Sequence, residues 1–377
     1  MKKLNWVLGP LLILLFVYGY RSFTGGFENF SFFTADCTIF SRSGTVLYYS
    51  RGQLCDFSND GKVISSDPLA NKLQLTDKDE TVLWASHENV HHDLKFSNDQ
   101  NSILLISSEI IDYDGQSVRS DCFSKRNLKN TILAQWCLSQ NLKVIQRLGF
   151  TIRTQRADQF AITDLTNAEY EISHANTIYE IKKNRLSEKN EAFKEGNFLV
   201  DLHGPIFALL ILDQNMKRVL WAKNLGRQKY GIDYLSFEAH DSQVTEDGKI
   251  LSYINIHKTF NLSIFANSVE RFNIPTAEYG WGSSLVKFDP YLESVDWIYQ
   301  ASPKFKFRSR ILGSVTELKN GNFLFSDISE KVPSIYEVNR DRRVIWRFAL
   351  PFNSSGKIRK TKPLYQVDFL KARGLIP

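Results

Sequence analysis

The chain has 377 residues, of which 43% are apolar and 13% are aromatic, so it can bury a large core in one extended domain or in two. Its net charge of +6 is mildly basic and compatible with an anionic partner. That charge is too small to identify a partner by itself, and we expect no nucleic-acid partner.

The N-terminus starts with Lys2 and Lys3, followed by an uncharged apolar run from Leu4 to Tyr20. This run is close to the shortest that can span a bilayer as a helix. No small-residue cleavage site and no cysteine stand directly after it. We therefore expect residues 1–22 to form an uncleaved single-pass membrane anchor, and residues 23–377 to lie in the periplasm or outside the cell. The alternative is a cleaved signal peptide.

Four cysteines follow, at Cys37, Cys55, Cys122 and Cys137. An even number outside the cytoplasm permits disulfides, and we favour pairing the sequence neighbours, Cys37 with Cys55 and Cys122 with Cys137. Some of them could instead be free buried thiols. Because no Cys-x-x-Cys motif occurs, we expect neither a thiolate metal site nor a thioredoxin-like redox site.

One sequence phrase recurs along the chain. It consists of a strand, a polar turn and a returning strand that ends near a tryptophan. Its copies cover residues 75–84, 212–221, 288–297 and 338–346, and residues 139–146 resemble a degenerate copy. Each copy places Asp or Asn where a tight turn is expected. The phrase therefore predicts a series of β-hairpins.

A second phrase puts a turn directly before a strand, at residues 98–104, 194–199, 246–251 and 319–324. Asp-Gly and Asn-Gly suit turns that need a positive φ. Two hairpins per unit give four strands, and five or six such units fit the chain length. We therefore predict an all-β fold, a β-propeller of six blades; a β-sandwich or two unrelated β domains are the alternatives.

Three other segments are harder to interpret. Residues 184–194 form either a short surface helix or a polar loop. Basic and other residues alternate over Lys304–Arg310, which indicates either an anion-binding strand face or a solvated strand. The basic residues Lys357, Arg359, Lys360 and Lys362 are expected to belong to a solvated tail.

Three histidines, His92, His174 and His240, occupy matching positions, each beside a short apolar strand. Repeat units arranged around an axis would bring them together, where neutral imidazole can act as nucleophile, base or ligand. The alternative is that they are buried and bonded to backbone. His92 with Asp93 and His240 with Asp241 could form His-Asp dyads, but neighbours on an extended strand point to opposite faces. We therefore expect Asp93 and Asp241 to satisfy backbone groups of turns.

Two further histidines raise alternatives. His87 lies close to His91 and His92, so a zinc or copper site is one alternative, although adjacent histidines on a strand suit one ion poorly. His257 follows no repeat phrase and is expected at the surface.

From about Leu75 to the C-terminus, these phrases resemble the bacterial arylsulfate sulfotransferase family. His92 matches a His-His-Asp phrase, His174 and Asn176 match a His-Ala-Asn-Ser signature, and His240 matches the phrase that carries the family's covalent histidine. The resemblance implies a six-bladed propeller with a central active site. It also implies transfer of a sulfuryl group between phenols through a sulfated histidine, with no nucleotide donor.

The chain departs from the family pattern at His203, where the family usually has an arginine. A histidine does not replace the permanent fork of a guanidinium, and loss of one oriented donor commonly lowers a rate by ~10²–10³-fold. Either His203 acts as an imidazolium, or another cation replaces the arginine, or the activity has changed.

The resemblance assigns roles to six residues. We expect His240 to be the nucleophile, and His92 and His174 to bind sulfate oxygens or to move the phenolic proton. We expect Asn176, His203 and His91 to bind the substrate. No metal and no cofactor are expected, and the ligand would be a small aryl sulfate.

Two other functions stay open from the sequence. One is a non-catalytic propeller that binds an anionic glycan. The other is an assembly scaffold at the membrane.

Overall fold

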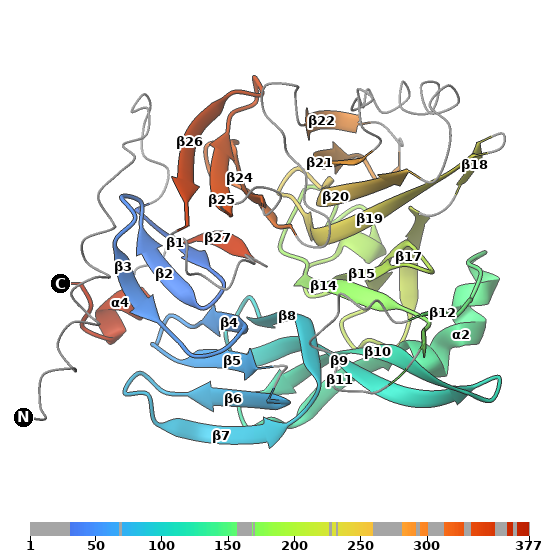
Figure 1. The fold of residues 1–377 in the computed structure, drawn as a ribbon, viewed down its shortest axis with the longest axis horizontal. Coiled ribbons are helices and arrows are strands. Elements are labelled where there is room, and N and C mark those ends of the chain that lie inside the picture. Colours follow the sequence, from blue (N-terminus) through green and yellow to red (C-terminus); the bar gives the residue numbers. More distant parts are fainter. Residues whose placement is uncertain are drawn as a thin grey trace, which may run out of the picture.

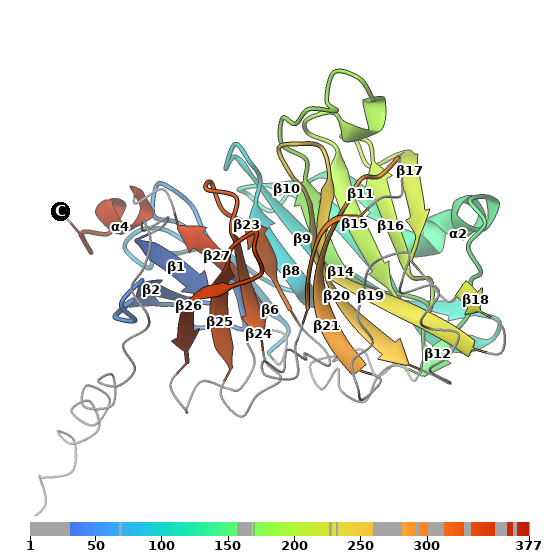
Figure 2. The same cartoon turned by 90° about the horizontal axis from the view of Figure 1, so that it is seen from above.

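The computed structural model describes residues 31–67, 70–156, 168, 170–225, 228–230, 233–258, 281–291, 295–300, 313–327, 333–350, 360–364 and 368–376. Within these ranges, six largely antiparallel sheets surround a common axis, as Figure 1 shows and Figure 2 shows from above. The predicted six-bladed β-propeller is confirmed. None of the described helices is long and apolar enough to cross a membrane, and the expected anchor lies outside the described residues.

The first three blades are numbered from the N-terminus. Blade one contains β1 (Phe32–Ala35), β2 (Thr38–Ser41), β3 (Val46–Tyr49) and the C-terminal β27 (Thr361–Leu364). Blade two contains β4 (Leu54–Phe57), β5 (Val63–Asp67), β6 (Lys72–Thr76) and β7 (Val82–His87). Blade three contains β8 (Val90–Phe96), β9 (Ser102–Tyr113), β10 (Gln116–Asn127) and β11 (Ile132–Cys137), with the short β12 (Gln155–Arg156) and β13 (Tyr170–Glu171) added beside β10.

The other three blades complete the ring. Blade four contains β14 (His174–Glu180), β15 (Phe198–His203), β16 (Ala208–Leu212) and β17 (Val219–Asn224). Blade five contains β19 (Asp233–Val244), β20 (Ile250–Lys258), β21 (Trp281–Phe288) and β22 (Val295–Gln300), with β18 (Gln228–Tyr230) beside β19. Blade six contains β23 (Val315–Glu317), β24 (Phe323–Asp327), β25 (Ser334–Val338) and β26 (Val344–Ala349).

The burial of each strand follows its place in the blade. The middle strand β16 is buried along its whole length, because neighbouring blades cover both faces, and its sequence is accordingly a continuous apolar run. The outer strand β7 alternates between exposed and half-buried residues, as a strand with one solvated face does. The core thus lies between the blades.

The recurring phrase ending near tryptophan forms the outer hairpin of blades two, four, five and six. In blade two, the Asp77 carboxylate accepts hydrogen bonds from the backbone N–H groups of Asp79 (2.9 Å) and Thr81 (2.8 Å) and closes the turn. Asp213 and Asn339 accept equivalent bonds in blades four and six. The chemistry of this turn explains why the phrase recurs.

Two predictions were wrong or needed refinement, and a third falls on residues that the structure does not describe. Residues 139–146 lie in the helix α2 (Leu138–Arg147), whose inward face carries Leu138 and Ile145 at helical spacing. Residues 184–194 form a loop that ends in one 3₁₀ turn (Glu191–Phe193). Residues 304–310, with their alternating basic residues, lie outside the described residues, so their interpretation stays a prediction.

The ring closes where the two ends of the chain pair. β27 pairs antiparallel with β1, with Thr34 opposite Lys362, and Figure 1 shows the red β27 beside the blue β1. Lys360 and Lys362, expected in a solvated tail, instead form ion pairs with Asp93 and Asp56 of other blades. A short helix, α4 (Asp368–Ala372), follows β27.

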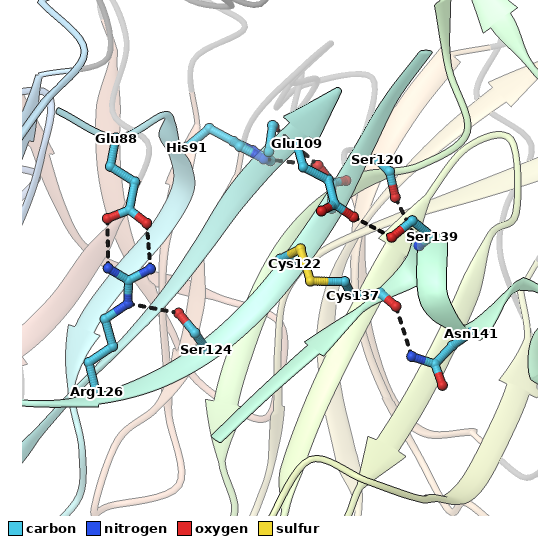
Figure 3. Close-up of a disulfide and its surroundings, with 12 residues drawn as sticks. Glu88, His91, Glu109, Ser120, Cys122, Ser124, Arg126, Cys137, Ser139 and Asn141 are labelled. Atoms are coloured by element: carbon cyan, nitrogen blue, oxygen red, sulfur yellow. Dashed lines mark hydrogen bonds and ion pairs between the residues drawn. A yellow bond between two sulfur atoms is a disulfide. The ribbon is translucent and has the colours of Figure 1, made fainter. Parts of the chain in front are cut away.

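Both predicted disulfides are confirmed, and none of the four cysteines is free. Cys37–Cys55 links blade one to blade two. Cys122–Cys137 links β10 to β11, as Figure 3 shows. The second disulfide lies next to Asp121 along β10.

Removing the second disulfide should lower stability without preventing ring closure. The bond closes a loop with a sequence separation of 15 residues. A cross-link over such a loop is worth about 2–4 kcal/mol, largely by restricting the unfolded chain. Cys122→Ser with Cys137→Ser should lower the free energy of unfolding by that amount in denaturant titrations. An unchanged midpoint would show that the disulfide contributes nothing.

Candidate active site

Five histidines from blades three, four and five form a continuous row, which we call the histidine row. It runs in the order His91, His92, His174, His203 and His240, and the centroids of adjacent rings lie 4.5–5.6 Å apart. His91 and His92 lie on β8, His174 starts β14, His203 ends β15 and His240 lies on β19. The three histidines expected to converge therefore do so, and the two expected to assist them lie in the same row.

Two β-bulges shape this row. His92 has φ 56° at a register shift between β8 and β9, and Asp241 has φ 49° at a shift between β19 and β20. Because β8 is not extended at His92, the adjacent rings of His91 and His92 reach each other. Their Nδ1 atoms lie 2.7 Å apart.

The row begins as a chain of hydrogen bonds. Besides the bond between His91 and His92, Nε2 of His92 lies 3.0 Å from Nε2 of His174. Nδ1 of His174 lies 2.8 Å from Nη2 of Arg119 and 3.2 Å from Oε2 of Glu171. Burial, opposed by Glu171, lowers the pKa of His174.

Three buried charges at the ends of this chain were not predicted. Arg119 and Asp121 lie two residues apart on β10 and therefore share one face of the strand. Arg119 forms an ion pair with Glu171 of β13, and Asp121 accepts from Nε2 of His91 at 3.0 Å. The signal in the sequence was a pair of ionisable residues at strand spacing between Val118 and Cys122, since buried charged residues are rare.

The other end of the row is organised around His203. Nδ2 of Asn176 lies 3.3 Å from Nδ1 of His203 and 3.1 Å from the Ala239 carbonyl. Nε2 of His203 lies 3.2 Å from Oε1 of Glu238. Burial opposes protonation, but the Glu238 carboxylate raises the pKa of His203 above its usual value. His203 can thus supply positive charge where the family has arginine.

The ligand atoms of His203, Glu238 and His240 lie within 4.8 Å of one another, close enough for a metal ion. The hydrogen bonds of His203 do not favour a metal ion at this position. Because Asn176 donates to Nδ1, the proton of a neutral His203 lies on Nε2 and faces Glu238. His87 is exposed at the end of β7 and belongs to no potential ligand group among the described residues.

Asp93 and Asp241 do not orient their neighbouring histidines. Asp93 accepts from the backbone N–H of Ile178 at 3.0 Å, and Asp241 accepts from that of Val315 at 3.1 Å, so each joins its blade to the next. They satisfy backbone groups as expected, but across blades and not within a turn. Lys360 contacts both carboxylates. The side chain of His257 lies outside the described residues.

A buried carboxyl beside the row gives a pH-dependent prediction. Burial raises the pKa of Asp201 from 3.8 to about 7. Its contribution to stability is therefore complete below 3.8 and is lost as the pH rises through about 7. In the wild type, Asp201 accepts from the backbone N–H of Asn176 at 2.9 Å. An asparagine at position 201 keeps an oxygen that can accept this bond.

Asp201→Asn should therefore gain stability relative to the wild type as the pH rises. The difference in unfolding free energy should grow by up to about 4 kcal/mol between pH of about 4 and about 8. Denaturant titrations at several pH values measure this difference. A difference that stays constant with pH would contradict the prediction.

The fold and the histidine row define the chain as a six-bladed β-propeller with a polar, histidine-rich cluster between three of its blades. Residues 38–350 match the family described as Arylsulfotransferase (ASST). The chain belongs to this family, and the resemblance predicted from the histidine phrases is confirmed.

Comparison with one solved structure adds support for the fold alone. A protein of unknown function from Bacteroides caccae is 11% identical, with a TM-score of 0.50, over 86% of this chain and 93% of that one. The β-propeller domain of Cps50 (Swd1) from Myceliophteria thermophila is 11% identical, with a TM-score of 0.42, over 88% of each chain. No curated protein matches the chain.

Proposed function

We propose that this protein transfers a sulfuryl group from an aryl sulfate to a phenolic acceptor, with His240 as the covalent nucleophile. The observation that carries the proposal is the histidine row. The residues that match the family's motifs, His92, His174, Asn176 and His240, come from three blades and gather in one cluster.

The hydrogen bonds of the row support a division of roles. An imidazole nucleophile must be neutral and must offer a lone pair to the sulfur. His91, His92 and His174 bond to one another and to charged residues, and His203 contacts Asn176 and Glu238. We assign these four to binding and orienting the substrate, and we assign the covalent step to His240, whose phrase matches the one that carries the family's covalent histidine.

Positive charge for the sulfuryl oxygens is assigned to His203. Sulfuryl transfer resembles phosphoryl transfer, in which charge on the peripheral oxygens is stabilised mainly by positioned donors. The guanidinium of Arg119 is engaged by Glu171 and His174. His203, whose pKa Glu238 raises, is the better replacement for the family's arginine.

The location is part of the proposal. We place the propeller outside the cytoplasm, held by an anchor in residues 1–22. Two disulfides support an oxidising compartment, since such bonds are rare in the cytosol. Fractionation of cells that express the full chain would test this: the protein should stay with membranes in high salt and be released by detergent.

The test of activity uses a chromogenic aryl sulfate as donor and a phenol as acceptor. The phenolic chromophore should be released in proportion to the sulfated acceptor formed, with no nucleotide present. Ping-pong kinetics are expected, because a covalent intermediate separates the two half-reactions. Absence of transfer across several donors and acceptors would contradict the proposal.

A second function, binding of an anionic glycan without catalysis, is favoured by the histidine at position 203 in place of arginine. Calorimetry with a sulfated glycan would distinguish the two. Binding that survives His174→Ala with His240→Ala, in a protein without transferase activity, would favour the second function.

A further inference from the structure

The chain of hydrogen bonds through His91, His92 and His174 ends at Asp121, whose surroundings fix its protonation. Oδ1 accepts from Nε2 of His91 (3.0 Å) and the Ser108 hydroxyl (3.3 Å). Oδ2 accepts from the Ser173 hydroxyl (2.8 Å) and the Ala175 N–H (2.7 Å). Burial raises the pKa of Asp121, but the contacts with His91, Arg119 and the Ala175 N–H hold that pKa below its usual range. Asp121 is therefore ionised, and Nε2 of His91 carries a hydrogen.

The opposite end of the chain is fixed by Arg119. A guanidinium only donates and does not lose its proton in proteins. Because Nη2 of Arg119 lies 2.8 Å from Nδ1 of His174, this nitrogen accepts, and the proton of a neutral His174 lies on Nε2. Glu171 holds the guanidinium in place, and Gln155 donates to the same carboxylate at 2.8 Å.

With both ends fixed and all three rings neutral, only one set of tautomers satisfies the contacts of the rings with Asp121, with Arg119 and with one another. Nε2–H of His174 donates to Nε2 of His92, at 3.0 Å. Nδ1–H of His92 donates to Nδ1 of His91, at 2.7 Å. Nε2–H of His91 donates to Asp121. Each ring has one hydrogen, and every lone pair in the chain accepts.

We infer that Asp121 and Arg119 are positioning residues that hold these three imidazoles in a single hydrogen-bond polarity. In this state, His92 and His174 have no lone pair available for attack at sulfur. Their N–H groups are engaged within the chain as well, so a substrate oxygen must replace His92 as the acceptor for Nε2–H of His174, a donor that the chain has already oriented. This consequence for catalysis rests on the proposed function, whereas the polarity itself does not.

Nuclear magnetic resonance measures the polarity directly. In protein labelled with ¹⁵N-histidine, long-range ¹H–¹⁵N correlations distinguish a protonated ring nitrogen from one with a lone pair. We expect the Nε2–H tautomer at His91 and His174 and the Nδ1–H tautomer at His92, at neutral pH and without substrate. An Nε2–H tautomer at His92, or a doubly protonated ring in the chain, would overturn the inference.

Variants of Arg119 test how the polarity is fixed. Without a donor at its Nδ1, His174 should take up a second proton there and donate to Glu171, 3.2 Å away. In Arg119→Met, His174 should therefore become doubly protonated, while His91 and His92, held by Asp121, keep their tautomers. Arg119→Lys keeps a donor and should keep the wild-type tautomers.

Arg126→Met is the matched control, because Arg126 is also buried on β10 and forms an ion pair with Glu88, away from the chain of imidazoles (Figure 3). It should leave the three tautomers unchanged. A folded Arg119→Met protein with wild-type tautomers would overturn the role of Arg119. If that variant does not fold, the wild-type spectrum decides. Both readouts are independent of transferase activity, so a failure of the proposed function would be recognised separately.

Discussion

Replacing His240 with alanine is expected to lower the rate of sulfuryl transfer by roughly 10³–10⁶-fold, because removal of a covalent nucleophile abolishes the two-step route. The effect should appear in kcat for both half-reactions, and the initial burst of released phenol should disappear. Initial rates and rapid-mixing measurements with a chromogenic aryl sulfate check this.

Two controls separate catalysis from folding in this experiment. His240 is only 4% exposed and lies beside Tyr253, so its truncation leaves a cavity, and His240→Gln should be assayed with it. His87→Ala removes an exposed histidine outside the row and should keep the wild-type rate. A folded His240→Ala protein that keeps more than about a tenth of the wild-type rate would contradict the nucleophile assignment.

Ending the chain after residue 359 is expected to prevent cooperative folding. It removes β27, which completes blade one next to β1. Thr361 also bonds Ser314 at 2.9 Å and the Thr34 carbonyl at 2.7 Å, while Lys360 pairs with Asp93 of blade three. The loss should be comparable to the whole stability of a domain, about 5–15 kcal/mol.

Thermal unfolding and near-ultraviolet circular dichroism measure this loss. The truncated chain should show no cooperative transition, whereas Lys371→Ala, an exposed change on α4 after the closing strand, should unfold like the wild type. A truncated chain with a cooperative transition and native near-ultraviolet signal would show that the ring does not depend on β27.

The fold could be predicted because local chemistry repeats in every blade. Asp77, Asp213 and Asn339 close equivalent turns, and such turns are visible in sequence. The blade-three copy was misplaced because Asn127, which closes the corresponding turn of β10 and β11, has no tryptophan at the expected spacing. The adjacent segment instead carries apolar residues at helical spacing and forms α2.

The site could be predicted only in part. Histidines in matching phrases were expected to meet, and they do. Arg119, Asp121 and Glu171 were missed because their importance depends on contacts between blades, which no local pattern encodes. Lys360 was misassigned for the same reason, since its partner Asp93 lies 267 positions away in the chain. The bulge at His92 likewise depends on strand pairing.

The most direct test of the central claim is mass spectrometry of the enzyme during turnover. The enzyme is supplied with an aryl sulfate and no acceptor, and the reaction is quenched with alkali. Our account predicts one added SO₃ group on the peptide that contains His240, which disappears when a phenol is supplied. Sulfation of His92 or His174 instead, or steady turnover with no sulfated histidine, would contradict it.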